Sequence, residues 1–220
     1  MSQFRQTLEC WQCGRPSEHS LFCRYCDSLQ PPVADYFRFF GLEPRLKIDA
    51  AQLEKRFYEL SRRLHPDRYL RRSPVEQQYS LEATAILNDA YRVLRDPVAR
   101  AEYVLKQAGF ESAEPRAKAL DPALLEEVFE LNEALEALRR GAASARGSLE
   151  QARRRFLDLR AAIDGELEDL FARYDESRTR PVLAEIRKLL DRRKYVQNLV
   201  EQLDRELSTE QADAVTPDRL

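Results

Sequence analysis

The sequence predicts an all-α protein with a short cysteine-rich segment before its helices. Apolar residues recur at alternating steps of three and four over much of the chain, which is the spacing of one buried helix face. Asp or Pro begins several of these stripes, and Gly follows some of them. All four cysteines lie in the first 26 residues. We therefore expect a four-cysteine metal-binding segment over 1–32, a four-helix domain over 33–109, a linker over 110–119, a three-helix bundle over 120–208 and a tail over 209–220.

The cysteines form two Cys-x2-Cys pairs, Cys10 with Cys13 and Cys23 with Cys26, with nine residues between the pairs. Each pair can fold as a knuckle that directs two thiolates at one point, and two knuckles complete a closed tetrahedral site suited to structural zinc. The alternatives are two disulfides, or iron held by the same ligands as a single ion or a cluster. The apolar floor of the knuckles is expected to come from Trp11, Phe22 and Tyr25.

A helical hairpin is predicted between residues 49 and 94. Asp49 can cap a helix with an apolar stripe at Leu53, Phe57, Leu60 and Leu64. Pro66 lacks a backbone donor and disfavours helical geometry at His65, so the first helix must end there. A second helix of similar length follows Pro74, with a stripe at Leu87, Ala90, Tyr91 and Leu94. The tripeptide His65-Pro66-Asp67 is therefore expected at the tip of an antiparallel hairpin.

Two shorter helices are expected beside the hairpin. An aromatic-rich segment over 35–42 precedes it, and Asp96-Pro97 opens a helix that Gly109 stops. This pattern, with Asp35-Tyr36-Phe37-Arg38-Phe39-Phe40-Gly41-Leu42, His65-Pro66-Asp67 and Asn88-Asp89-Ala90-Tyr91-Arg92-Val93-Leu94, resembles the J domain of DnaJ-family co-chaperones. The resemblance implies that the tripeptide docks on a DnaK-type chaperone and triggers its ATP hydrolysis.

Basic residues near the tripeptide belong to the same expectation. The second helix of a J domain usually presents a basic face, so the resemblance implies chaperone contacts for Arg56, Arg62, Arg63 and Arg68 as well. The alternative for each cation is a solvated helix face. Many general J domains carry a Lys-Arg pair about two turns before the tripeptide, where this chain has Tyr58-Glu59. A dedicated partner is therefore favoured over a general one, and the partner that the resemblance implies is a chaperone of the DnaK or HscA type.

The C-terminal half is predicted to form an antiparallel three-helix bundle. Asp121-Pro122 opens a helix that ends at Gly141, a second helix covers about 149–174, and Pro181 begins a third that continues through Leu203. The stripe of the first helix comprises Leu124, Val128, Leu131, Leu135 and Leu138.

A second stripe lies on the first bundle helix. Leu125 and Phe129 are about 100° round from the core stripe, and Glu133 continues their line with Glu126 and Glu130 nearby. Two large apolar groups bordered by carboxylates predict a partner site. The alternative is a wide buried face that packs on the four-helix domain.

A J domain followed by such a bundle is similar to the HscB family of iron–sulfur cluster co-chaperones, over roughly residues 34–208. The resemblance implies that an IscU-type scaffold protein is bound through Leu125, Glu126, Phe129, Glu130 and Glu133. Position 126 is commonly a large apolar residue in that family, so Glu126 departs from the pattern. The four-cysteine segment resembles the metal-binding extension of longer members, including mitochondrial ones.

Composition limits the other classes of function. With 36 basic and 38 acidic residues the formal net charge is −2, which gives no bulk attraction to nucleic acid or anionic membranes. Only two histidines occur and the cysteines close their own site, so no enzyme activity is expected. No signal-peptide pattern is visible, which favours a cytoplasmic location, or the mitochondrial matrix if the N-terminus is processed. The alternative function is a J-domain co-chaperone that recruits the same chaperone to a different client.

Overall fold

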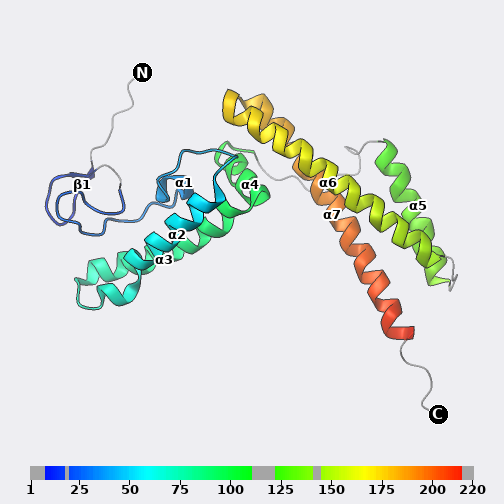
Figure 1. Cartoon of the computed structure of the whole chain (residues 1–220), viewed down its shortest axis with the longest axis horizontal. Coiled ribbons are helices and arrows are strands. Elements are labelled where there is room, and N and C mark those ends of the chain that lie inside the picture. The colour runs from blue at the N-terminus through cyan, green and yellow to red at the C-terminus, as the bar shows by residue number, and fades with distance from the viewer. Residues whose placement is uncertain (1–7, 18–19, 111–121, 141–144, 215–220) are drawn as a thin grey trace, which may run out of the picture. The chain divides into compact units, whose positions relative to one another are not determined.

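The computed structural model describes residues 8–17, 20–110, 122–140 and 145–214 (Figure 1). The chain divides into two compact units, Met1–Val104 and Leu105–Leu220. The expected all-α fold is confirmed, and the described sheet is a single pair of two-residue strands, β1 (Leu8–Glu9) and β2 (Pro16–Ser17). Of the expected linker over 110–119, only residue 110 lies within the described part of the chain.

The first unit contains the expected helical hairpin. Its elements are α1 (Tyr36–Phe39), α2 (Ala50–Leu64), the 3-10 helix η1 (Pro66–Tyr69) and α3 (Pro74–Arg95), and α4 (Pro97–Gln107) crosses the boundary between the units. Asp49 caps α2 as predicted, because its carboxylate accepts hydrogen bonds from the backbone N–H groups of Ala51 and Gln52 at 2.9 and 3.1 Å. Ser73 caps α3 by accepting from the N–H of Glu76.

The hairpin core consists of the predicted stripes. Their buried members are Leu53, Leu64, Leu87, Ala90 and Leu94. Phe57 and Tyr91 stack across the hairpin with their ring centroids 4.2 Å apart. The two helices were expected to be similar in length, but α3 with 22 residues is longer than α2 with 15. The Ser73 cap starts α3 well before its apolar stripe, and small buried residues, Ser80 and Ala83, fill the close contact there.

Buried polar groups fix the ends of the helices. The Leu64 carbonyl at the end of α2 accepts hydrogen bonds from Ser80 Oγ at 2.6 Å and Thr84 Oγ1 at 3.2 Å. The buried guanidinium of Arg100 donates to the carbonyls of Leu46 and Leu94. These bonds satisfy carbonyl groups at the ends of α2 and α3 and in the α1–α2 loop.

The second unit is built on α5 (Pro122–Arg139), α6 (Ala145–Ser177) and α7 (Arg180–Ala214). Helix α6 packs against both α5 and α7. Residue numbers fall along α7 as they rise along α6 in the pairs Arg153–Asp204, Arg160–Gln197, Asp164–Arg193 and Arg173–Glu185. Helices α6 and α7 are therefore antiparallel, as the predicted bundle requires. Four polar pairs line the contact between them.

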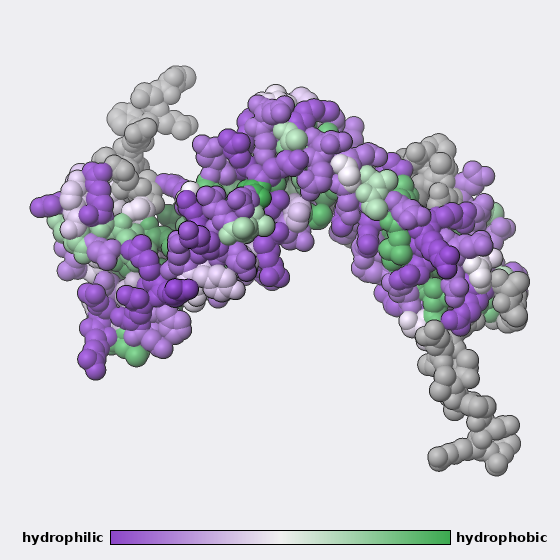
Figure 2. All heavy atoms as spheres, viewed as in Figure 1, coloured by the Kyte–Doolittle hydropathy of each residue, from purple (hydrophilic) through white to green (hydrophobic). Residues whose placement is uncertain are grey.

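The bundle helices are longer than their apolar stripes predict. Helix α6 starts at Ala145 rather than near 149, and α7 continues to Ala214, so residues 209–214 of the expected tail are helical. Polar residues favour these extensions, as in the i,i+4 pair of Arg146 with Glu150 at 3.2 Å. The face shown in Figure 2 is mostly hydrophilic. Among the helices described, none has the length and apolarity needed to cross a membrane.

Replacing Arg100 with Met should lower the free energy of unfolding by at least about 2 kcal/mol, because two buried carbonyls lose their charged donor. Urea unfolding of the full chain, followed by circular dichroism, measures this change. The exposed Arg92→Met in α3 is the matched control and should stay within about 0.5 kcal/mol of the native protein. An unchanged midpoint for Arg100→Met would mean that these hydrogen bonds contribute nothing net.

Candidate functional sites

The His65-Pro66-Asp67 turn stands at the end of α2, where the sequence places it. The backbone of His65 leaves the helix at ψ 127°, and Pro66 starts η1. The backbone N–H of Asp67 donates to His65 Nδ1 at 3.3 Å, and that nitrogen lies 3.5 Å from Asp67 Oδ2. The side chains of His65 and Asp67 are 55% and 77% exposed. The turn therefore holds an imidazole and a carboxylate in a fixed relation at the surface.

Tyr69 anchors this turn to α2 from the buried side. Its side chain is buried, and its hydroxyl donates to the backbone carbonyl of Arg63 at 3.1 Å. Burial raises the pKa of Tyr69, and the nearby carboxylate of Glu76 raises it further. The hydroxyl thus stays protonated and remains a hydrogen-bond donor.

The four predicted cations have different surroundings. Arg62 and Arg68 are exposed beside the turn. Arg56 instead donates to the carbonyls of Phe40 and Gly41, at the end of α1. Gly41 has φ +60°, and a Cβ there would lie 3.0 Å from the Arg56 guanidinium. Arg56 of α2 is therefore hydrogen-bonded to the backbone at the end of α1.

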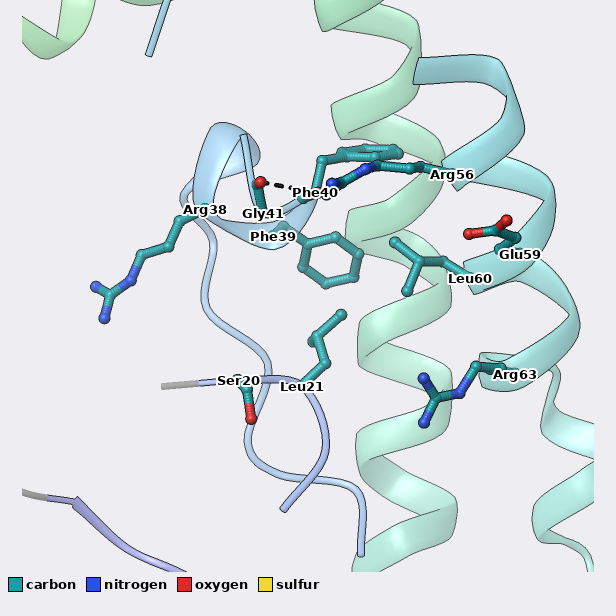
Figure 3. Close-up of a pocket in the computed structure, with 10 residues that line it drawn as sticks. All are labelled: Ser20, Leu21, Arg38, Phe39, Phe40, Gly41, Arg56, Glu59, Leu60 and Arg63. Carbon is teal, nitrogen blue, oxygen red and sulfur yellow. Dashed lines mark hydrogen bonds between the residues drawn. The ribbon is translucent and has the colours of Figure 1, made fainter. Parts of the chain in front are cut away.

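Arg63 contacts the four-cysteine segment. Its guanidinium lies 3.7 Å from the ring centroid of Phe22 and 3.3 Å from Asp27 Oδ1. A pocket of about 290 Å³ opens between this segment, α1 and α2, with Phe39 and Leu60 facing each other in it (Figure 3). Nothing in the sequence predicts that the knuckles pack on the hairpin, because an arginine at the end of a helix more often faces solvent.

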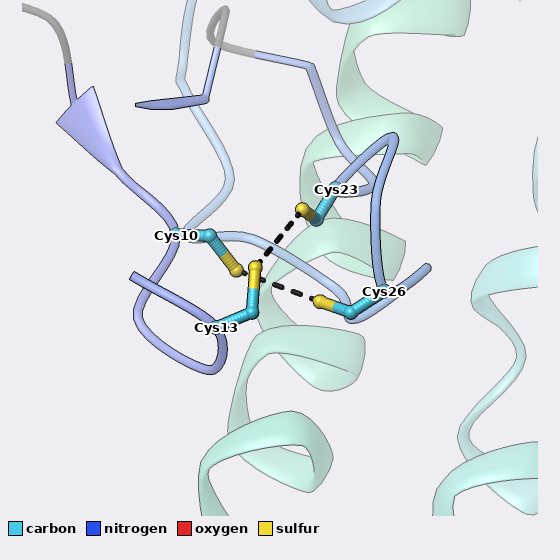
Figure 4. A group of neighbouring side chains, drawn as sticks. All are labelled: Cys10, Cys13, Cys23 and Cys26. Atoms are coloured by element: carbon cyan, nitrogen blue, oxygen red, sulfur yellow. Dashed lines mark hydrogen bonds between the residues drawn. The ribbon is translucent and has the colours of Figure 1, made fainter. Parts of the chain in front are cut away.

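The four cysteine thiols converge on one point, as predicted (Figure 4). Cys10 and Cys26 Sγ are 3.7 Å apart, Cys13 and Cys23 Sγ are 3.8 Å apart, and all four lie within 4.8 Å of one another. The four cysteines are free thiols, and these separations are far too long for the disulfide alternative. Four thiolates about 2.3 Å from one ion at a tetrahedron's centre stand about 3.8 Å apart. The arrangement fits a single metal ion.

The two knuckles repeat the same turn. Gly14 follows Cys13 with φ +68°, and Asp27 follows Cys26 with φ +55°. The N–H of Gly14 donates to the Cys10 carbonyl at 2.9 Å, and that of Asp27 donates to the Cys23 carbonyl at 2.8 Å. This left-handed position suits Gly, and Asp tolerates it better than most residues do.

Buried polar groups surround the thiols. The Gln30 amide donates to Cys10 Sγ at 3.3 Å and to Ser28 Oγ at 2.9 Å. Burial raises the pKa of the Cys10 thiol, but hydrogen bonds with Ser28 and with two backbone N–H groups outweigh it and lower the pKa to about 5. Hydrogen bonds with the side chain and backbone of Ser28 also lower the pKa of Cys26. These hydrogen bonds favour the thiolate form of Cys10 and Cys26. A backbone hydrogen bond lowers the pKa of Cys13, but burial and contacts with the other three thiols outweigh it and raise the pKa to about 11.

The aromatic residues of the segment do not form the predicted common floor. The Trp11 indole N–H donates to the Leu29 carbonyl at 2.7 Å. Its ring packs edge to face with that of Tyr79 in α3, with the ring centroids 6.2 Å apart. Phe22 lies under Arg63, and Tyr25 is 45% exposed. Trp11 and Phe22 thus contact the hairpin, while Tyr25 lies beside Arg15 and Arg24 of its own segment.

The strip on α5 lies at the surface of the second unit. Leu125 and Phe129 are 42% and 64% exposed, whereas Leu131 and Leu135 of the core stripe are buried. The carboxylates of the strip, Glu126, Glu130 and Glu133, are exposed. Glu130 pairs with Arg155 of α6 at 3.3 Å. The side chain of Leu124 lies outside the described residues.

Three apolar residues on or near the turn are exposed, and the helix spacing does not predict them. Leu70 is 71% exposed directly after η1, and Val75 and Leu81 of α3 are 40% and 57% exposed. The sequence could have identified them only by exclusion, since none of the three belongs to the core stripe of α3.

Both units have recognisable relatives. Residues 35–103 match the DnaJ domain, and residues 120–204 match the HSCB C-terminal oligomerisation domain. The chain is 35% identical over 133 residues to the mouse iron–sulfur cluster co-chaperone protein HscB, a match over 58% of this chain and 57% of that protein. It is 41% identical over 124 residues to the co-chaperone protein HscB homolog of Bordetella pertussis, a match over 55% of this chain and 73% of the relative.

The solved structures agree with these matches. The crystal structure of human co-chaperone protein HscB superposes with a TM-score of 0.65 at 26% identity, over 90% of this chain and 98% of that one. In sequence, the chain spans little more than half the length of the mouse protein. With both family domains in order and a relative matched over most of its length, the chain belongs to the HscB family of co-chaperones.

Proposed function

We propose that the protein is an adaptor in iron–sulfur cluster assembly that delivers an IscU-type scaffold to a DnaK- or HscA-type chaperone and stimulates the ATPase of that chaperone. The observation that carries the proposal is the presence, in one chain, of an exposed His65-Pro66-Asp67 turn and an exposed apolar strip bordered by carboxylates. The names of the relatives, as iron–sulfur cluster co-chaperones, support the same process.

The turn supplies the contact with the chaperone. The exposed carboxylate of Asp67 can accept a bidentate hydrogen bond from an arginine of the partner. The bond from its own backbone N–H to His65 and the fixed ring of Pro66 hold this carboxylate in place before binding, which lowers the entropy lost on docking. The exposed Arg62 and Arg68 attract an acidic partner surface and raise the association rate.

The strip on α5 supplies the contact with the scaffold. Leu125 and Phe129 lie one turn apart and can enter an apolar hollow together. The carboxylates of Glu126 and Glu133 border them and favour a partner with basic residues around that hollow. Because both surfaces belong to one chain, scaffold and chaperone are held at a high effective concentration, so modest individual affinities suffice.

The four cysteines are proposed to bind structural zinc. The separations of their thiols fit one tetrahedral ion, whereas a multinuclear iron–sulfur cluster needs ligands spread around several metal and sulfide atoms. Zinc supplies no redox chemistry here; it neutralises the thiolates and orders a segment too small to hold a core.

Replacing His65 with Gln should reduce stimulation of the chaperone ATPase to less than about a tenth, because the side chain that orients Asp67 at the centre of the contact is lost. Steady-state ATP hydrolysis, with and without scaffold, measures the effect, and the native chain should stimulate more than additively with scaffold. The exposed Glu82→Gln on α3 is the control. Stimulation that is the same with and without scaffold would favour a different client. Stimulation by His65→Gln at the level of the native chain would contradict the assignment of the turn.

Replacing Phe129 with Ala should weaken scaffold binding by about 10- to 100-fold, because the contact loses one large apolar group. Isothermal titration calorimetry with an IscU-type scaffold measures the affinity, and stimulation of the ATPase without scaffold should be unchanged. Leu81→Ala, which truncates an exposed apolar residue of the other unit, should leave the affinity unaltered. Equal affinities for Phe129→Ala and the native chain would remove α5 from the interface.

The reduced protein should hold one zinc ion per chain, and Cys26→Ser should weaken zinc binding by well over about 100-fold, since losing a ligand costs more than losing its supporting hydrogen bonds. Competition with a chromophoric chelator gives the affinity, and elemental analysis gives the metal. Tyr25→Phe keeps all four ligands and should bind as the native chain does. Preferential retention of iron when both metals are supplied would overturn the choice of zinc.

A further inference from the structure

Arg63 joins the four-cysteine segment to the hairpin. Its guanidinium lies over the Phe22 ring at 3.7 Å and pairs with Asp27 Oδ1 at 3.3 Å. Phe22 directly precedes the ligand Cys23, and Asp27 directly follows the ligand Cys26. Arg63 is therefore clasped by the two residues that flank one knuckle.

The fold of this knuckle sets the positions of both clasping residues. Asp27 has φ +55°, and its N–H donates to the Cys23 carbonyl at 2.8 Å, which closes the turn around the ligands. Phe22 forms a bridge with Leu29 on the other side of the knuckle. A segment of this size has little core of its own, so its order depends on the bound ion. Loss of the ion should therefore release Arg63.

Arg63 in turn contacts the chaperone-docking turn. Its backbone carbonyl accepts the hydrogen bond from the buried Tyr69 hydroxyl at 3.1 Å. Tyr69 belongs to η1, the same short helix that contains Pro66 and Asp67. A continuous series of contacts thus runs from Cys23 and Cys26 through Arg63 and Tyr69 to the turn.

A second anchor holds the segment independently of Arg63. Trp11, the only tryptophan of the chain, follows the ligand Cys10 and meets Tyr79 of α3 edge to face. The segment should therefore stay docked when Arg63 is replaced, and the fluorescence of Trp11 reports its docking.

We propose that Arg63 is a positioning residue through which metal binding at the four cysteines orders the His65-Pro66-Asp67 turn. The metal site then supports chaperone docking at a distance, without touching the chaperone. This role rests on the proposed function of the turn and of the metal site. An exposed ion pair and a cation–π contact together favour the ordered turn by roughly tenfold. Such coupling requires a test in which both ends are perturbed.

Amide hydrogen exchange of residues 67–72 in the full chain provides this test, comparing the zinc-loaded protein with protein stripped by a chelator under reducing conditions. The Arg68 N–H, which donates to the His65 carbonyl, and the Arg72 N–H, which donates to the Tyr69 carbonyl, are the reporters. In the native chain, zinc removal should speed their exchange roughly tenfold. Arg63→Gln with zinc bound should already exchange at the faster rate, and zinc removal should add nothing further.

Two further variants sharpen the result. Arg62→Gln removes the neighbouring exposed cation, and its hydrogen exchange with and without zinc should match that of the native chain. Asp27→Asn keeps a residue that tolerates the left-handed conformation but removes the ion pair, so its exchange with zinc bound should be intermediate. Trp11 fluorescence of zinc-loaded Arg63→Gln should match the native chain, which shows that the segment is still docked.

The proposal is overturned if zinc removal leaves the exchange of the turn unchanged in the native chain, or if its effect persists in full in Arg63→Gln. Because this measurement contains no chaperone, it is independent of the ATPase assay. Metal-dependent exchange in a chain that fails to stimulate any DnaK-type chaperone would support the coupling and contradict only the proposed function.

Discussion

The end of α2 at His65 is the constraint on which the first unit depends. Pro66 cannot supply the next helical hydrogen bond, so the chain leaves the helix and the Leu64 carbonyl needs another donor. Ser80 and Thr84 of α3 provide it, which fixes how α3 lies against α2. The same break opens η1, and Tyr69 returns from η1 to the carbonyl of Arg63. Pro66 thus helps to set how α3 lies against α2, and it places His65 and Asp67 at an exposed turn.

Most of the fold follows from local signals in the sequence. Asp49 and Ser73 cap their helices because a short polar side chain can reach a free N–H, and this depends on neighbouring residues alone. Helix ends without such signals were harder to place. Helix α7 continues to Ala214 because polar residues such as Glu206 prolong a helix without any apolar stripe to reveal it. Spacing identifies which face is buried, but it does not reveal where a solvated helix stops.

The candidate sites divide in the same way. Cys10, Cys13, Cys23 and Cys26 converge as predicted, because two short knuckles leave few other arrangements. The exposure of Leu125 and Phe129 also follows from spacing on one helix. The contacts of Arg63 and Trp11 could not be predicted, since each joins segments more than 30 residues apart in sequence through a single side chain. Periodicity carries no information about such pairings, and one arginine in a basic helix resembles the next.

The different surroundings of the four cations refine the idea of a basic face on α2. Arg56 holds the carbonyls at the end of α1, and Arg63 is clasped by Phe22 and Asp27, so both guanidinium groups are partly engaged within the unit. Arg62 and Arg68 are exposed and flank the turn. A guanidinium already bound to carbonyls or stacked on a ring must give up these contacts before it can meet a partner, which costs affinity. Under the proposed function, steering toward a chaperone therefore falls mainly to Arg62 and Arg68, while Arg56 and Arg63 make contacts within the first unit.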